Sequence, residues 1–117
     1  MIRRAVIASL ALAVALVLAP SASFAASEHV TQAILETEEA IKEGKANNAS
    51  SFAEHAHNAL DHAQAEAGDA KPTGHLKSAI THLRQGIKTA KRTHHESRIA
   101  RGVHHAEQAL TDLRAMQ

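Results

Sequence analysis

"HLKSAITHLRQGIK", residues 75–88, contains one six-residue unit twice in succession. The copies "HLKSAI" and "HLRQGI" each begin with histidine and leucine and end with a small residue followed by isoleucine. They are seven residues apart, which is two turns of an α-helix, so equivalent residues lie on one helical face. The stretch therefore predicts an amphipathic helix that packs against other helices.

The same unit recurs elsewhere in the chain. Its other copies are "HVTQAI" from residue 29, "ETEEAI" from 36, "HAHNAL" from 55, "RIARGV" from 98 and "HAEQAL" from 105. In heptad notation the six residues occupy positions c to g and then a, and the a and d positions form the apolar stripe of a packed helix. Position g is always Ala or Gly, which lets neighbouring helices approach closely and leaves room for an imidazole at position c. The alternative is that these small residues only reflect an Ala-rich composition.

Loop signals divide the chain into four helical segments. "GKANNAS" (44–50) and "GDAKPTG" (68–74) are rich in Gly, Asn and Pro. The predicted N-terminal caps are Ser27, Ser51 with Glu54, Thr73, and Thr93 with Glu96. The predicted helices span residues 28–43, 51–67, 74–91 and 94–115. Short loops between four amphipathic helices predict an all-α fold, an up-down-up-down antiparallel four-helix bundle.

The first 25 residues differ from the rest. Arg3 and Arg4 precede the apolar run "AVIASLALAVALVLA", and small residues follow at Ser23 and Ala25. This order predicts a secretory signal peptide, residues 1–25, cleaved after Ala25. A retained membrane anchor is the alternative, because the run is nearly long enough to span a bilayer. Residues 26–117 are then one exported bundle domain, expected to be a monomer without membrane contact after cleavage.

Charge is divided unevenly along this domain. Residues 26–70 hold nine acidic residues and two lysines, a net charge of −7, whereas residues 71–117 hold nine basic and three acidic residues, a net charge of +6. A basic half is typical of nucleic-acid binding, but an equally acidic half in an exported chain argues against a nucleic-acid partner. We expect the halves to pack together, with Lys and Arg of the third helix paired to the acidic helices.

Several chemistries are excluded by composition. The chain contains no cysteine, which excludes disulfides, thiolate metal sites and covalently attached haem. It also lacks a recognisable nucleophile motif, a Gly-rich phosphate loop and an HExxH sequence. We therefore expect a protein that is not an enzyme.

Histidine is the most informative residue type, because all ten copies lie after residue 25. Imidazole is the commonest protein ligand for late first-row metals. In antiparallel helices, the c positions near one end of the bundle are His29, His62, His75 and Asp112. The c positions nearer the middle are Glu36, His55, His82 and His105. Which of them meet depends on the handedness of the bundle, which the sequence leaves open.

Further candidates lie within single helices. His57 with Asp61, and His62 with Glu66, are i,i+4 pairs that can act as two-residue clips. His104 adjoins His105, while the roles of His94 and His95 at a predicted turn stay open. The predicted metal ligands are His29, His55, His57, His62, His75, His82, His104 and His105, with Glu36, Asp61, Glu66 and Asp112 as candidate carboxylate ligands.

Nitrogen and oxygen donors without thiolate favour Cu(II) first, then Ni(II) and Zn(II). Protons compete for imidazole, so bound metal is released as pH falls. We expect several weak or moderate sites that bind divalent transition metals, rather than one closed cage. An alternative function is an exported interaction or stress module whose histidines act as a pH sensor, because protonation adds charge to tightly packed helix contacts.

The chain resembles the small metal-binding protein (SmbP-like) family of bacterial periplasms over essentially all of residues 26–117. The resemblance is carried by "HVTQAILETEEAIKEGK", "FAEHAHNALDHAQAEAG", "GHLKSAITHLRQGIK" and "VHHAEQALTDLRA". It implies a periplasmic four-helix bundle that binds Cu(II) and other divalent ions, to buffer or sequester them. Family members are richer in histidine, whereas this chain has Glu36, Glu43, Thr89, Arg98 and Asp112 at such positions. Fewer or weaker sites are therefore implied.

Overall fold

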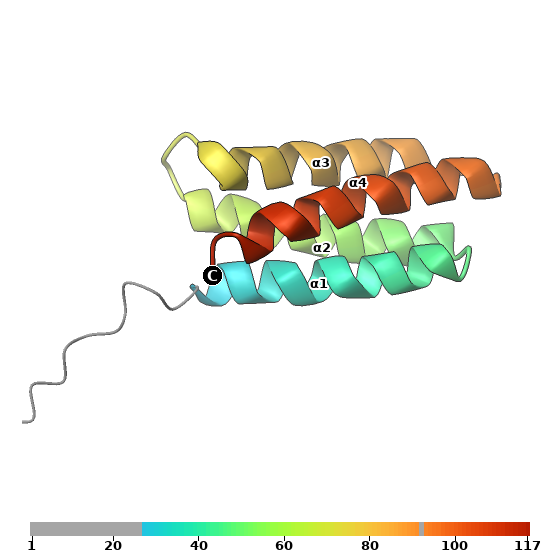
Figure 1. The fold of residues 1–117 in the computed structure, drawn as a ribbon, viewed down its shortest axis with the longest axis horizontal. Coiled ribbons are helices and arrows are strands. Elements are labelled where there is room, and N and C mark those ends of the chain that lie inside the picture. The colour runs from blue at the N-terminus through green and yellow to red at the C-terminus, as the bar shows by residue number, and fades with distance from the viewer. Residues whose placement is uncertain (1–26, 92) are drawn as a thin grey trace, which may run out of the picture.

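The computed structural model describes residues 27–91 and 93–117, and this part of the chain forms four α-helices without strands (Figure 1). Helix α1 spans Glu28–Lys45, α2 spans Ala49–Ala67, α3 spans Gly74–Ala90 and α4 spans Glu96–Arg114. Successive helices are antiparallel, and each contacts two neighbours, α1 and α3 both lying against α2 and α4. The all-α up-down-up-down four-helix bundle is therefore confirmed. The predicted signal peptide, residues 1–25, lies outside the described residues.

None of the described helices has both the length and the apolar character needed to cross a membrane.

Local capping sets the start of the first two helices. Ser27 caps α1 as predicted, its Oγ accepting a hydrogen bond from an amide of the first turn at 3.1 Å. Helix α2 begins before Ser51, because Asn47 adopts a left-handed conformation (φ 59°) and the Asn48 side chain accepts a hydrogen bond from the Ser51 amide. Asparagine tolerates both conformations well. The predicted capping box of Ser51 and Glu54 is wrong, and Asn48 is the cap.

The starts of α3 and α4 differ from the prediction in detail. Thr73 occupies the N-cap position of α3, as predicted, but makes no side-chain cap bond. Thr93 Oγ1 accepts a hydrogen bond from the His95 amide at 3.1 Å, and α4 begins only at Glu96. The predicted capping box of Thr93 and Glu96 is therefore wrong, because the threonine closes a local turn before the helix instead.

The apolar stripes of the four helices meet in the core of the bundle. Phe52 is the only Phe, Tyr or Trp among the described residues, and its side chain is fully buried. Around it pack Ile, Leu, Val and Ala side chains from all four helices. All small residues at position g are buried, namely Ala33, Ala40, Ala59, Ala79, Gly86, Gly102 and Ala109.

Three glycines surround the ring of Phe52. A Cβ added at Gly44, Gly86 or Gly102 would lie 2.9, 3.6 or 3.3 Å, respectively, from an atom of this ring. Gly86 and Gly102 also face each other, and a Cβ on either residue would lie 3.1 Å from the carbonyl oxygen of the other. Glycine therefore allows α3 and α4 to approach closely, and the space that it leaves is bordered by the Phe52 ring and, at Gly86, also by the Cβ of His105.

The two oppositely charged halves are joined by few ion pairs. Arg114 of α4 donates to Glu38 of α1 at 2.7 Å, and Lys45 of α1 lies 3.4 Å from Glu107 of α4. Both pairs lie at the α1/α4 contact. The expectation that Lys and Arg of α3 pair with the acidic helices is wrong, because none of them forms an ion pair within the described part of the chain.

Candidate metal site

The c-position side chains meet inside each helical hairpin. They form two seams, one between α1 and α2 and one between α3 and α4. The α1/α2 seam contains the pairs His29–His62 and Glu36–His55, and the α3/α4 seam contains His75–Asp112 and His82–His105. We call each pair a layer. Successive layers of a seam are seven residues apart, about 10 Å along the helix.

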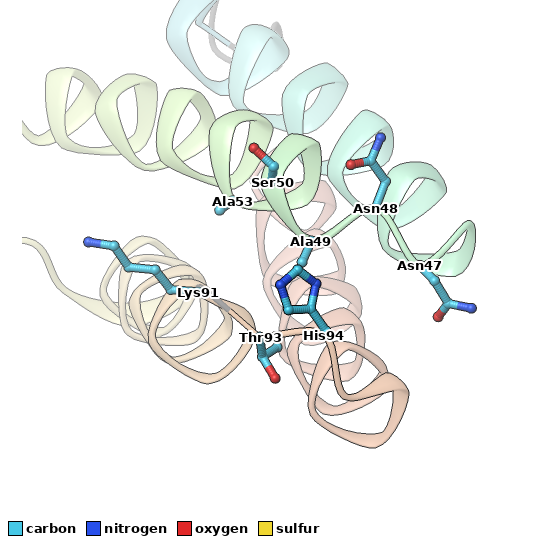
Figure 2. A pocket seen from close by; sticks show the side chains of 8 residues that line it. All are labelled: Asn47, Asn48, Ala49, Ser50, Ala53, Lys91, Thr93 and His94. Atoms are coloured by element: carbon cyan, nitrogen blue, oxygen red, sulfur yellow. The ribbon is translucent and has the colours of Figure 1, made fainter.

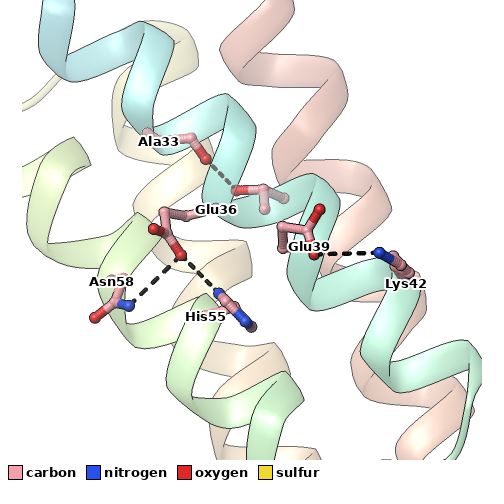
Figure 3. Close-up of polar contacts among 7 residues, drawn as sticks. Ala33, Glu36, Glu39, Lys42, His55 and Asn58 are labelled. Atoms are coloured by element: carbon pink, nitrogen blue, oxygen red, sulfur yellow. Dashed lines mark hydrogen bonds and ion pairs between the residues drawn. The ribbon is translucent and has the colours of Figure 1, made fainter.

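Glu36 and His55 form the middle layer of the α1/α2 seam. His55 Nδ1 lies 2.8 Å from Glu36 Oε2, and Asn58 donates a hydrogen bond to the same oxygen at 3.5 Å (Figure 3). The hydrogen bond to Glu36 outweighs burial and raises the pKa of His55 above its ordinary value of 6.5. A metal ion at this layer must therefore compete with a proton that Glu36 stabilises.

His29 and His62 form the layer at the end of the same seam. Their ring centroids are 5.9 Å apart, and the ring planes are inclined by 38°. Ser27 donates a hydrogen bond to Glu66 close to this layer. Glu66 was predicted to pair with His62, but it accepts a hydrogen bond from Ser27 instead. The side chain that faces His62 is the imidazole of His29 on the neighbouring helix.

Asp112 contacts two histidines of α3. His75 Nδ1 lies 3.1 Å from Asp112 Oδ1, and His82 Nε2 lies 4.0 Å from Oδ2. Partial burial opposes ionisation of Asp112, but hydrogen bonds with Ser78 and His75 and the nearby His82 hold its pKa below the ordinary value. The carboxylate is therefore ionised at neutral pH and directed at two imidazoles.

The rings of His82 and His105 are stacked across the α3/α4 seam. Their centroids are 6.1 Å apart with an angle of 26° between the planes, and the ring of His104 lies 6.4 Å from that of His105. The Nδ1 atoms of His82 and His105 are both buried without a hydrogen-bond partner within the described residues. Buried polar atoms normally have a partner. These two nitrogens are therefore candidate ligand atoms that no other group of the described residues engages.

The other predicted ligands lie outside the seams. His57 and Asp61 are exposed on α2, and His57 shares a surface pocket with basic residues of α3. His94 lines a pocket of about 390 Å³ at the turn end of the bundle, together with Lys91 and the residues around the start of α2 (Figure 2). Among the described residues that line this pocket, His94 is the only His, Asp or Glu. His95 is exposed directly before α4.

The seams bring donors together in pairs. Within residues 27–91 and 93–117, no group of three or more His, Asp or Glu side chains is arranged to hold one metal ion. A layer that supplies two ligands leaves coordination positions for water or another ligand, as in open rather than closed metal sites. This arrangement fits several open sites of moderate affinity better than one closed cage.

The sequence prediction omits a third layer in each seam. Asn48 donates a hydrogen bond to Glu43 at 3.0 Å, one heptad beyond the Glu36 layer. At the equivalent level of the α3/α4 seam, Thr89 and Arg98 line one pocket. The same seven-residue spacing, continued toward the loops, would have found both layers. The seams thus end in an acidic layer in one hairpin and a basic layer in the other.

Comparison with known families gives a match over most of the chain. A family model described as small metal-binding protein matches residues 4–116. The chain belongs to the small metal-binding protein family. No curated protein matches the chain. Membership of the small metal-binding protein family supports metal binding in general, and the two seams are where this chain offers paired donors for it.

Proposed function

We propose that this protein binds divalent transition metals reversibly at its two histidine seams and thereby buffers or sequesters them in the periplasm. The observation that carries the proposal is the pairing of c-position side chains in four layers, each with at least one imidazole. Family membership supports metal binding as such. Binding itself is the proposed activity, without catalysis, and the periplasmic location rests on the predicted signal peptide.

The donor types favour Cu(II), with Ni(II) and Zn(II) bound more weakly. Imidazole and carboxylate donors without thiolate follow the general order of divalent affinities, in which Cu(II) stands highest. Metal–nitrogen bonds are about 2.0 Å long, so two imidazoles that share one ion have ring centroids roughly 4.5–6.5 Å apart. The layers His29–His62 and His82–His105, at 5.9 and 6.1 Å, lie within this range.

Calorimetric titration of the mature protein with Cu(II), Ni(II) and Zn(II) at pH 7 tests the proposal. We expect Cu(II) to bind most tightly and at more than one site. Absence of any binding tighter than about 0.1 mM would refute it, because isolated surface histidines bind comparably.

Two variants separate the seams from the other histidines. His62→Gln/His82→Gln/His105→Gln removes one imidazole from the His29–His62 layer and both imidazoles from the His82–His105 layer. The control His57→Gln/His94→Gln/His95→Gln removes three imidazoles outside the seams. We expect the first variant to lose most Cu(II) binding and the control to retain it, with circular dichroism confirming that both are helical. Equal losses would place the binding outside the seams.

The pH-sensor alternative finds mixed support in the same layers. Protonation of His55 strengthens its contact with Glu36, as the raised pKa of His55 indicates, and this opposes the loosening that a sensor requires. Protonation of both rings of His29–His62 or His82–His105 would instead place like charges in one layer. Unfolding of the metal-free protein at about pH 5 and about pH 7.5 distinguishes the readings, since unchanged stability excludes a sensor.

A further inference from the structure

A pocket lined by basic residues lies over the α3/α4 contact, directly beside the His82–His105 layer. Its volume is about 390 Å³, and its lining residues are Gln85, Lys88, Thr89, Arg98, Arg101 and His105. We call it the basic pocket. None of these lining residues is acidic, so the pocket presents three cationic side chains and one imidazole to whatever enters it.

The basic side chains of this pocket have no acidic counterpart. Within the residues that the structure describes, Lys88, Arg98 and Arg101 form no ion pair, although Arg114 on the same helix is paired with Glu38 at 2.7 Å. Like charges that share a pocket repel one another, and solvent weakens this repulsion without removing it. The basic pocket therefore carries positive charge that the protein itself does not neutralise.

The first hairpin has the opposite charge at the same level. There the third layer is Glu43 with Asn48, a carboxylate with an amide. A cation in the α1/α2 seam thus has an acidic side chain one layer away. A cation at His105 has Arg98 one heptad away and Arg101 on the lining of the same pocket. Repulsion therefore acts on the second hairpin alone, at the layer that holds the two unpartnered Nδ1 atoms.

We propose that the basic pocket binds a small oxyanion of the phosphate class, which serves as the external ligand of a metal ion held at the His82–His105 layer. The anion neutralises the repulsion between the ion and the three basic side chains. Guanidinium groups bind phosphate oxygens in a bidentate manner. His105 connects the two parts, because it belongs to the layer and lines the pocket. Only the ligand role rests on the proposed function.

The anion site is tested on metal-free protein. Inorganic phosphate is titrated at constant ionic strength while amide resonances are followed by NMR, and we expect saturable shifts around the basic pocket. Arg98→Gln/Arg101→Gln should weaken phosphate binding at least about tenfold. The control Lys71→Gln/Lys77→Gln removes the same charge from exposed lysines elsewhere and should change it less than about twofold. Shifts that do not saturate, or equal weakening in both variants, overturn the anion site.

The ligand role is tested with Cu(II)-loaded protein. An unpaired electron on copper shortens the ³¹P relaxation time of a phosphate that exchanges beside it. At equal copper occupancy, we expect several-fold faster ³¹P relaxation with the unsubstituted protein than with Arg98→Gln/Arg101→Gln. Equal ³¹P relaxation rates in the two proteins would overturn the ligand role. The anion site itself would then still be judged by the phosphate titration of the metal-free protein. Absence of copper binding overturns the proposed function and the ligand role together.

Discussion

Gly102→Ala tests whether the α3/α4 contact requires a residue without a side chain. A Cβ at this position would lie 2.8 Å from the Cβ of Ala90, 3.1 Å from the carbonyl oxygen of Gly86 and 3.3 Å from Phe52 Cε1. Carbon atoms in contact are normally about 3.5–4.0 Å apart. The two helices must therefore separate by roughly 1 Å to admit the methyl group.

Two opposing effects set the magnitude of this change. Alanine stabilises a helix interior by about 1 kcal/mol relative to glycine, whereas overpacking a core costs about 1–3 kcal/mol. The crowded atoms at Ala90 and Gly86 are a Cβ and a backbone oxygen, which no side-chain rotation can move. We therefore expect a cost in the upper part of that range and a net destabilisation of about 1–2 kcal/mol. In a domain of this size, each kcal/mol lowers the Tm by about 4–8 °C.

Thermal unfolding followed by circular dichroism measures the effect. Gly86→Ala is the matched control, because its Cβ would meet its three nearest atoms at 3.1, 3.4 and 3.6 Å and should destabilise less. Ala65→Gly, at an exposed position of α2, gives the helix-propensity difference in this protein. A Tm for Gly102→Ala above that of the unsubstituted protein would refute the reasoning, because propensity would then outweigh the contact.

Three further predictions concern the core, the α1/α2 seam and the bound ion. Phe52→Ala should lower the free energy of unfolding, measured in urea, by about 3–5 kcal/mol. A decrease below about 1 kcal/mol would contradict the packing of the core around Phe52. The raised pKa of His55 means that its contact with Glu36 stabilises the fold fully below pH 6.5 and fades as pH rises through that pKa. Glu36→Gln should therefore destabilise more at about pH 6 than at about pH 8.5, and a pH-independent loss would exclude this linkage. Cu(II) at about 100 times its Kd should stabilise the fold by about 2.7 kcal/mol, and EDTA should reverse this stabilisation. An unchanged Tm would show that Cu(II) does not bind the folded protein more tightly than the unfolded chain.

The fold was predictable because one short pattern recurs in all four helices. Apolar residues at a and d, with Ala or Gly at g, specify helix packing wherever they occur, and loops rich in Gly and Asn separate the copies. Helix starts were less predictable, because a capping pattern is short and competes with its neighbours. At α2 the backbone of Asn47 and the side chain of Asn48 started the helix before Ser51 could cap it.

The pairing of the site residues was not predictable from the heptads. A c-position residue borders a single neighbouring helix, and the handedness of the bundle decides which one. The heptads therefore predicted that His29, His62, His75 and Asp112 lie at one level of the bundle, but not which of them form pairs. In the folded chain the pairs form within each helical hairpin. The basic pocket was missed for a related reason. Lys88 of the third helix was expected to pair with an acidic helix, but it forms no ion pair within the described residues and lines the pocket beside Arg98 and Arg101.

The four layers differ from one another in chemistry, and this has a consequence for how the protein would respond to metal supply. If these layers bind metal as proposed, their affinities for the ion would differ, because the layers offer different donors. One is a bis-imidazole pair, one an imidazole that shares a proton with a carboxylate, one a carboxylate shared by two rings, and one a bis-imidazole pair beside arginines. Identical sites would all fill within one narrow range of free ion concentration. Unequal sites fill one after another, so occupancy rises gradually across a wide range. On the proposed function, such a chain would act as a graded reservoir of metal rather than as a switch.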